Sequence, residues 1–160
     1  MIKLVRCDDR LIHGECMTVI TKYYSIDQII VIDNFVASNS IMKTIFKSAV
    51  PPNIVLDVYS TSDFVAAVTE ALTSSKSTLV LVSTPTSFIP LYDAISDLPK
   101  TVNVGPMSKR PDTEKIIYGT HLKAEEIEAV KNLDARGIDV YFNAVPERER
   151  ADWKDIKNAY

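Results

Sequence analysis

The sequence is poor in the residues that several common functional sites require. It has only four glycines in 160 residues, too few for a glycine-rich loop that cradles nucleotide phosphates. The patterns G-x-G-x-x-G, G-x-x-x-x-G-K-[ST], G-x-S-x-G and H-E-x-x-H are all absent. These absences argue against a dinucleotide- or NTP-binding loop, a hydrolase nucleophile elbow and a zinc-protease helix.

Cysteines, basic stripes and long apolar runs are also scarce. Cys7 and Cys16 are the only cysteines, which excludes a disulfide scaffold and suits a reducing cytosol. The net charge is −3, and no stripe of Lys and Arg with interleaved aromatics suggests nucleic-acid binding. No stretch approaches the ~20 apolar residues that span a bilayer, and MIKLVRCDD does not resemble a signal peptide. We therefore expect a cytoplasmic protein that reaches a membrane only through a partner.

Short β-branched apolar runs recur along the chain. A hydrophobic fraction of 46% and a charged fraction of 24% are typical of a globular protein, and residues 1–160 suffice for a single domain. Runs that are apolar at consecutive positions are typical of strands covered on both faces. Such runs occupy residues 2–5, 28–33, 53–60, 77–83, 101–105, 115–119 and 138–145. The last run but one follows its predecessor without a helix, which indicates a hairpin or an antiparallel edge strand.

Segments with helical periodicity separate most of these runs. Three helices are predicted over residues 36–50, 62–74 and 123–136, with Ser62 as the cap of the second and Gly137 as the left-handed stop of the third. In the first, one apolar stripe is expected to face the core: Ile41, Met42, Ile45, Phe46 and Ala49. This alternation predicts an α/β fold with a mostly parallel sheet. The charged tail, residues 146–160, is expected to form a surface segment or helix pinned by Trp153.

The densest group of functional side chains is CDDRLIHGEC, residues 7–16. It lies between the first predicted strand and a helix predicted over residues 14–24, where open α/β sheets bind ligands. His13 and Gly14 fall near the helix N-terminus, where free backbone N–H groups favour an anion. A neutral imidazole is a good nucleophile near neutral pH, so His13 is a candidate for phosphoryl transfer.

Charged neighbours of His13 fit the same interpretation. Arg6 and Arg10 can supply guanidinium groups, whose planar fork matches phosphate oxygens. Asp8 or Asp9 could accept a hydrogen bond from the ring nitrogen that does not react. On local sequence alone, however, a histidine at a helix start is more often a capping or surface residue, and these acids could be ordinary loop residues.

Two other histidine arrangements are less favoured. Cys7, His13 and Cys16 could suggest a metal site, but three ligands without a fourth make structural zinc improbable, so no metal is expected. His121 is the only other histidine, and we expect it at the surface.

The stretch VRCDDRLIHGE, residues 5–15, resembles a family signature that runs roughly V-R-I-D-D-R-L-I-H-G-Q. That signature belongs to the IIB components of the mannose/fructose/sorbose family of sugar phosphotransferase systems (PTS). QIIVIDNFVASNSIMKTIFKSAVPPNIVLDVYS, TVNVGPMSKR and LDARGIDVYFNAVP are similar to later parts of the family. The resemblance covers about residues 1–146.

The resemblance implies a phosphoryl carrier without a cofactor, built on an open, mainly parallel seven-stranded sheet with helices on both faces. Its histidine would accept a phosphoryl group from a phosphorylated IIA domain. It would then pass the group to a sugar of the mannose, fructose, sorbose or N-acetylgalactosamine class, bound by the membrane proteins IIC and IID. A homo-oligomer stays open.

The resemblance also assigns roles within the site. The phosphohistidine is His13, and Arg10 is expected to bind the phosphoryl oxygens. Asp8 and Asp9 would orient His13 or order its loop. The remaining phosphate-binding positions are expected at Arg6, Gly14 and Glu15.

Two departures from the signature leave alternatives open. Glu15 stands where the family has glutamine, and its carboxylate could repel a phosphoryl group or point away as a first-turn acid. Ile20 stands about where the family often has tryptophan. A regulatory module that binds an anion without transferring phosphate therefore stays open. A histidine phosphatase is the other alternative, although it needs an arginine where Ile12 stands and a second histidine, for which only His121 is available.

Overall fold

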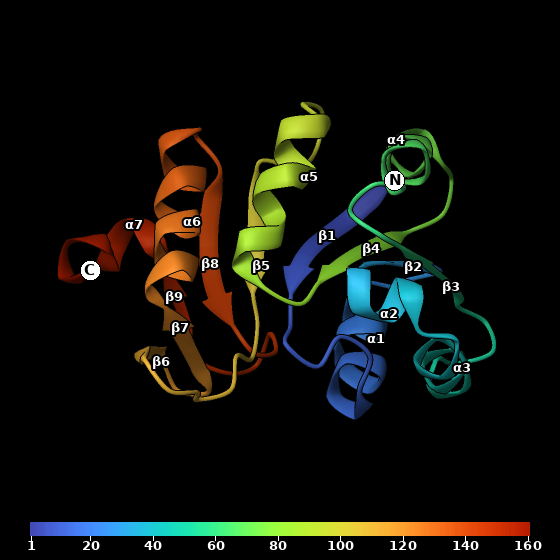
Figure 1. Cartoon of the computed structure of the whole chain (residues 1–160), viewed down its shortest axis with the longest axis horizontal. Coiled ribbons are helices and arrows are strands. Elements are labelled where there is room, and N and C mark those ends of the chain that lie inside the picture. Colours follow the sequence, from blue (N-terminus) through green and yellow to red (C-terminus); the bar gives the residue numbers. More distant parts are fainter.

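A computed structural model describes residues 1–160 and is organised around a seven-stranded sheet (Figure 1). In spatial order the strands are β3 (Val55–Tyr59), β2 (Gln28–Ile32), β4 (Thr78–Val82), β1 (Ile2–Cys7), β5 (Thr101–Val104), β8 (Asp139–Asn143) and β9 (Arg150–Asp152). Every neighbouring pair is parallel except β8 and β9, which are antiparallel. The predicted α/β fold with an open, mainly parallel seven-stranded sheet is confirmed.

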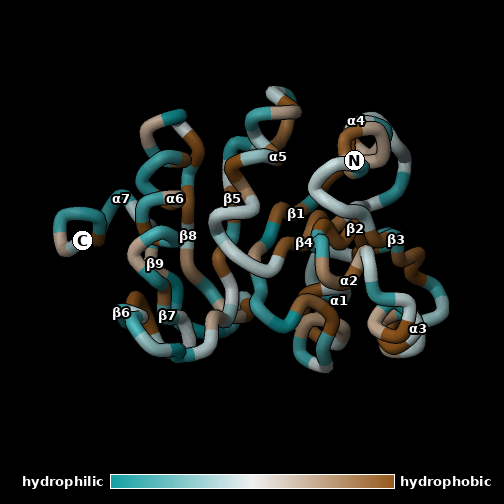
Figure 2. Tube along the Cα trace, viewed as in Figure 1, coloured by the Kyte–Doolittle hydropathy of each residue, from teal (hydrophilic) through white to brown (hydrophobic).

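Alternate side chains of the central strands enter two hydrophobic clusters, one on each face of the sheet. On β2, Ile30 and Ile32 belong to one cluster, whereas Ile29 and Val31 belong to the other. Burial on both faces explains why these strands read as uninterrupted apolar runs, visible as the brown centre of Figure 2.

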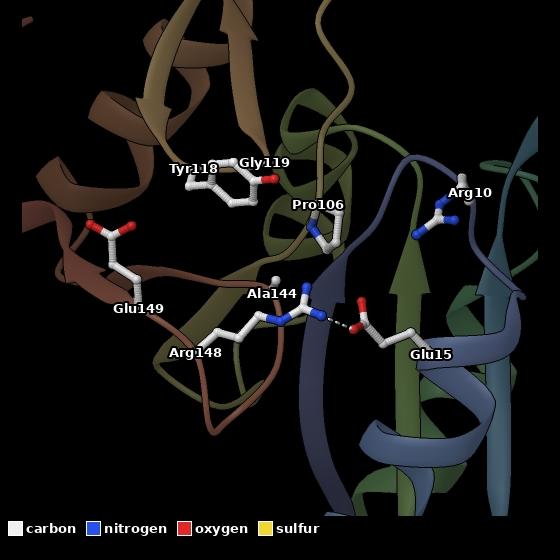
Figure 3. Close-up of a pocket in the computed structure, with 8 residues that line it drawn as sticks. All are labelled: Arg10, Glu15, Pro106, Tyr118, Gly119, Ala144, Arg148 and Glu149. Atoms are coloured by element: carbon white, nitrogen blue, oxygen red, sulfur yellow. Dashed lines mark ion pairs between the residues drawn. The ribbon is translucent and has the colours of Figure 1, made fainter.

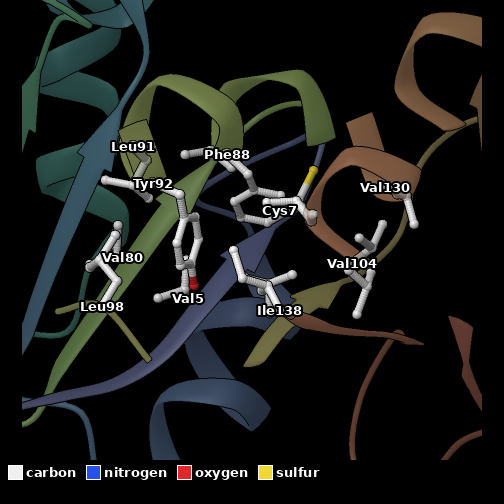
Figure 4. Packing of buried hydrophobic residues seen from close by; sticks show 14 of the residues in the cluster. Val5, Cys7, Val80, Phe88, Leu91, Tyr92, Leu98, Val104, Val130 and Ile138 are labelled. Carbon is white, nitrogen blue, oxygen red and sulfur yellow. The ribbon is translucent and has the colours of Figure 1, made fainter. Parts of the chain in front are cut away.

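Helices cover both faces of the sheet. The larger cluster lies under α4 (Val65–Thr73), α5 (Phe88–Ala94) and α6 (Ala124–Ala135), and Figure 4 shows part of it around Val5 and Phe88. The smaller cluster is covered by the helix that follows His13, which contains a π-helical stretch (Cys16–Ile20) before α1 (Thr21–Tyr23), and by α2 (Asn34–Ser38) and α3 (Ser40–Ala49). No helix is both long enough and apolar enough to cross a bilayer.

The membership of the sheet differs from the predicted strands at two places. The run at 115–119 is not in the main sheet: β6 (Thr113–Ile117) pairs with β7 (Thr120–Lys123) in a separate antiparallel hairpin. The seventh strand is β9, which comes from the charged tail and has no apolar pattern of its own. Trp153 begins α7 (Trp153–Ile156) directly after β9 and is buried, as expected for the residue that pins the tail.

The helix predicted over residues 36–50 is broken, and part of its predicted core stripe is wrong. Asn39 has extended backbone angles, and its side chain accepts a hydrogen bond from the Met42 N–H to start α3. Phe46 faces the core, but Ile41 and Ile45 are 71% and 52% exposed. Met42 and Phe46 lie four residues apart on the covered side, so the residues just before each are turned toward solvent.

The ends of two other helices can be compared with their predicted signals. Ser62 does not cap α4, which begins at Val65; its hydroxyl bonds to that of Ser60 instead. Gly137 follows α6 with a φ of +75°, which confirms the predicted left-handed stop. The helix α5, which follows a short 3₁₀ turn (Pro85–Ser87), was not among the predicted helices.

Removal of the Trp153 side chain tests how strongly the tail is bound. The indole packs against Phe142 and Tyr160, with ring centroids 6.3 and 5.8 Å away. Trp153→Ala should lower the free energy of unfolding by about 3–5 kcal/mol, because a large buried side chain leaves a cavity. Chemical denaturation measures this change. The exposed Phe35→Ala is the control, and equal effects of both variants would contradict the structure.

Thiol reactivity provides a second test of the packing. Burial raises the pKa of Cys16 to about 12 and raises the pKa of Cys7 well above its ordinary value. Since the thiolate is the reactive form, a folded chain at pH 8 should resist an alkylating reagent, and both thiols should react after unfolding. Mass spectrometry counts the modified residues. Rapid modification of either cysteine in the folded chain would contradict this expectation.

Candidate functional site

The loop that carries His13 follows β1 at a point where the chain changes direction across the sheet. β1 lies between β4 and β5, and the connection through α5 carries the chain from one side of β1 to the other. The loop is fixed on both sides: the Asp8 N–H donates to Val82 O of β4 (2.9 Å), and the Asp9 N–H donates to Pro106 O beyond β5 (3.2 Å). Open α/β sheets bind ligands at such positions.

Two apolar residues anchor the loop from below. Leu11 and Ile12 are buried in the smaller hydrophobic cluster. Leu11 has a φ of +55°, a left-handed conformation that costs about 1–3 kcal/mol for a residue other than glycine. Burial of the two side chains offsets this strain. Because the two residues that precede it are buried in the core, the position of His13 at the start of the helix is fixed.

The imidazole of His13 is oriented by Asp8. His13 Nε2 lies 2.8 Å from Asp8 Oδ2, and the histidine side chain is 11% exposed. A carboxylate accepts a hydrogen bond, so Nε2 carries the proton and the neutral ring has its lone pair on Nδ1. Asp8 also accepts a hydrogen bond from the Arg10 N–H through its other oxygen (3.2 Å). Of the two acids predicted to orient His13, Asp8 is the one that contacts the ring.

Arg6 lies beneath Asp8 and is buried. Its Nη2 donates to Asp8 Oδ2 (3.1 Å) and to Ala144 O (2.9 Å), and Nη1 donates to Asn103 Oδ1 and Asn143 O. The expectation that Arg6 binds phosphate is wrong, because its guanidinium group is enclosed by the chain and its terminal nitrogens already have partners. Its role is to neutralise and position the buried carboxylate.

Gly105 makes room for that guanidinium group. A Cβ at this position would lie 2.5 Å from Arg6 Nη2, closer than side chains tolerate. Gly105 also donates a backbone hydrogen bond to Cys7 O (2.8 Å). A side chain here would displace Arg6 and, through it, Asp8. Glycine is therefore required by a close approach rather than by its backbone angles.

Asp9 has a different function from Asp8. Its Oδ2 accepts a hydrogen bond from the Ser108 N–H (2.7 Å), which fixes the loop after β5 beside the His13 loop. That loop is held from the other side by Arg110, whose guanidinium group forms two hydrogen bonds with Glu126 (2.9 and 2.8 Å). Asp9 thus orders the loop beside the site and forms no hydrogen bond with the imidazole.

A cavity of about 390 Å³ opens beside the loop (Figure 3). It is lined by Arg10, Glu15, Pro106, Tyr118, Gly119, Ala144, Arg148 and Glu149. The guanidinium group of Arg10 is exposed and forms no hydrogen bond or ion pair within the chain. It is therefore available to an anion from outside, as expected for a phosphoryl-binding residue.

Glu15 is occupied by a counter-ion that the local sequence does not indicate. Its Oε1 lies 3.0 Å from Arg148 Nη2, as the dashed line in Figure 3 shows. The expectation that Glu15 binds phosphate does not fit this geometry, because a carboxylate repels an anion and this one is directed at a cation. Gly14 is exposed, and a Cβ at its position would meet no atom within 4 Å, so only an outside group could approach it closely.

The remaining candidates lie apart from this network. Cys7 and Cys16 are buried in clusters on opposite faces of the sheet, and Cys7 Sγ contacts Met107 Sδ (3.6 Å). No group of three or more potential ligands is arranged to hold a metal. His121 donates its backbone N–H to Met107 O (2.9 Å); the residue is partly exposed, and its ring Nδ1 is buried without a partner.

Asn103, Gly105, Asn143 and Arg148 were missed as site residues. The first three lie at the ends of β5 and β8, in the stretches TVNVG and VYFNAV. Polar residues that end otherwise apolar strands were the available signal, because the carboxyl ends of parallel strands meet at one edge. Arg148 lies in a charged tail, where nothing in the local pattern separates it from its neighbours.

Comparisons with known proteins identify the family and the fold of the chain. A family model described as "PTS system sorbose subfamily IIB component" matches residues 2–159. The fructose-specific EIIB component of Bacillus subtilis (strain 168) is 28% identical over 155 residues, which cover 97% of this chain and 94% of that protein.

The mannose-specific EIIAB component of Escherichia coli (strain K12) is 28% identical over 156 residues, which cover 98% of this chain and 48% of that protein. The chain therefore spans about half the length of that relative. The crystal structure of the IIBSor domain of the sorbose permease from Klebsiella pneumoniae has a TM-score of 0.87 at 26% identity, covering 99% of this chain and 97% of that one.

The family match extends over nearly the whole chain, and the fold agrees with that of a solved IIB domain of the same subfamily. The chain belongs to the sorbose subfamily of PTS system IIB components, which take part in sugar phosphotransfer.

Proposed function

We propose that the chain is a phosphoryl carrier in which His13 accepts a phosphoryl group on Nδ1 and passes it to a sugar. The observation that carries this proposal is the hydrogen bond between His13 Nε2 and the buried Asp8 carboxylate (2.8 Å). It fixes which ring nitrogen is protonated and leaves the other with a free lone pair. A histidine that only capped a helix would not need a buried, charge-neutralised acid beneath it.

The transfer has two steps, and each step forms one bond to phosphorus and breaks another. The Nδ1 lone pair attacks the phosphorus of a donor phosphohistidine, and the donor nitrogen leaves with the electron pair of the broken bond. In the second step a sugar hydroxyl attacks the same phosphorus and loses its proton to water, while the P–N bond breaks and its electron pair returns to Nδ1. As His13 gains a bond at Nδ1 its ring becomes more positive, and Asp8 stabilises that charge. Arg10 binds the equatorial oxygens, for which its guanidinium group is free.

The partners follow from the family. The donor is a IIA domain, and the acceptor is a sugar held by the membrane proteins IIC and IID, so the carrier works in the cytoplasm beside the membrane. Relatives are named for mannose, fructose and sorbose, and the sugar is proposed to be of this class. The mannose-specific relative is named as a combined EIIAB component, which supports a direct encounter between A and B units.

The alternatives receive no support from the site. A histidine phosphatase needs an arginine directly before the nucleophile, and Ile12 is instead buried in the core. His121 is not placed as its second histidine, because its backbone N–H is bonded to Met107 O in the loop after β5 and no hydrogen bond joins it to His13 or Asp8. A module that only binds anions would not require the protonation state of one ring nitrogen to be fixed.

Phosphorylation of the chain tests the assignment of His13. Incubation with a phosphorylated IIA domain should add one acid-labile, base-stable phosphate, which His13→Ala abolishes and the control His121→Ala retains. Long-range ¹H–¹⁵N NMR of the labelled ring should place the phosphorus on Nδ1, because Nε2 is held by Asp8. Label that persists in His13→Ala would disprove the role of His13, and phosphorus on Nε2 would disprove the role of Asp8.

Substitution of Arg10 tests the phosphoryl-binding role. Arg10→Lys should slow the transfer by about tenfold, because a single ammonium group cannot reproduce two parallel hydrogen bonds to the phosphoryl oxygens. Rapid-quench measurement of the labelling rate gives this factor. Arg136→Lys is the matched control, since Arg136 pairs with Asp93 on α5 (2.6 Å). Equal rates for wild type and Arg10→Lys would place Arg10 outside the site.

A further inference from the structure

The ion pair between Glu15 and Arg148 joins the His13 helix to the loop after β8 across the cavity. Glu15 is two residues from His13, and Arg148 reaches it from the opposite wall, with Pro106 and Ala144 beside the pair (Figure 3). Glu149 points away from the pair on the far side of the cavity. Arg10 lines the same space without a partner.

The loop that carries Arg148 is connected to His13 by a series of partly buried and buried hydrogen bonds. Asn143 Nδ2 donates to Arg148 O (3.0 Å) and to Glu149 O (2.9 Å), so the loop cannot drift from the end of β8. Arg6 binds Asn143 O and Ala144 O on one side and Asp8 on the other. The backbone of Arg148 is therefore connected to the His13 imidazole through Asn143, Arg6 and Asp8.

The ion pair itself is held weakly. The side chain of Arg148 is 58% exposed, that of Glu15 is 27% exposed, and one nitrogen–oxygen contact joins them. Pairs of this kind contribute little to stability because water screens them. Arg148 thus combines a fixed backbone with a guanidinium group that can change its partner at small cost.

Addition of a phosphoryl group to His13 changes the electrostatics of the cavity. A phosphorylated side chain brings a charge of about −1.5 to −2, whereas a carboxylate brings a single negative charge. Glu15 follows His13 by two residues in the first turn of the same helix, so the added negative charge repels its carboxylate and attracts nearby cations more strongly than a carboxylate does. Arg148 and Arg10 are the two cations that line the cavity.

We propose that Arg148 is a second phosphoryl-binding residue, which Glu15 holds in the unphosphorylated chain and which moves to the phosphoryl group once His13 carries it. Arg10 and Arg148 then contact the phosphoryl oxygens from two sides, and Glu15 turns to solvent. The proposal rests on the proposed function, because it assumes that His13 can be phosphorylated. It also gives Glu15 a role: it keeps Arg148 directed at the site before the phosphoryl group arrives.

The test uses the whole chain and phosphoramidate, a small-molecule phosphoryl donor, so that no donor domain is needed. The ³¹P NMR shift of phosphorylated His13 is followed against pH to find the midpoint of the second ionisation of the phosphoryl group. A nearby cation favours the dianion and lowers this midpoint. Arg148→Gln should therefore raise it by about one pH unit, which corresponds to a tenfold change in the ionisation equilibrium.

Two further variants make the result specific to Arg148. Arg148→Lys keeps a cation and should restore most of the wild-type midpoint, which also covers the case in which the glutamine variant folds poorly. Arg136→Gln removes the same charge from the distant pair with Asp93 and should leave the midpoint unchanged. An unchanged midpoint in Arg148→Gln, or an equal rise in Arg136→Gln, overturns the proposal.

A direct observation of the partner change accompanies the titration. The side-chain Nε–H signal of Arg148, assigned by its loss in Arg148→Lys, should move on phosphorylation, and a signal that stays in place overturns the proposal.

If phosphoramidate labels His13 but a phosphorylated IIA domain does not, the proposed function fails while the test of Arg148 still stands. If His13 is not labelled by either donor, both proposals fall.

Discussion

The geometry of the site depends on one buried carboxylate. Asp8 has no exposed surface, and its Oδ2 is shared between the Arg6 guanidinium group and the His13 ring. A buried charge of this kind is tolerated only when it is paired and hydrogen-bonded. Arg6 is in turn fixed by groups at the ends of β5 and β8. The orientation of the imidazole is therefore set by the central strands of the sheet and not by the loop alone.

This arrangement divides the site into a rigid and an adaptable part. Beneath His13, Asp8 is paired with Arg6, whose buried hydrogen bonds go to the ends of β5 and β8, and this pairing fixes one nitrogen of the ring. Above it, Arg10 has no partner, and Arg148 has one exposed contact. Phosphoryl transfer asks the protein mainly for positioning and for neutralisation of charge. In the proposed function, a fixed nucleophile beside exposed guanidinium groups can meet both demands when a donor and an acceptor of different shape must use the same ring.

Features of the fold and of the site that depend on a local residue pattern could be predicted from the sequence. The strands buried on both faces, the left-handed Gly137 and the position of His13 at a strand-to-helix turn all have such a pattern. β9 does not, because Arg-Ala-Asp becomes a strand only by pairing with β8. The inward direction of Arg6 was equally inaccessible: an arginine in a strand is expected at the surface, and only Gly105, far along the chain, leaves space for it. Ile41 and Ile45 lie four residues apart, the same helical spacing as Met42 and Phe46. The local pattern therefore could not show that the second pair faces the core and the first pair faces solvent.

Glu15 shows why a substitution next to a reactive group has to be interpreted with its neighbours. The family signature that this stretch resembles has glutamine at the position, which adds no charge beside a phosphohistidine. A carboxylate there, taken alone, would oppose the arrival of an anion. Arg148 lies 3.0 Å away and neutralises it, so the pair together adds no net charge to the cavity. The acid and the arginine therefore form one unit, and in the proposed role of Arg148 the acid positions a cation for the phosphoryl group to bind. A glutamine at this position would hold that cation less firmly, since it offers no charge to attract it.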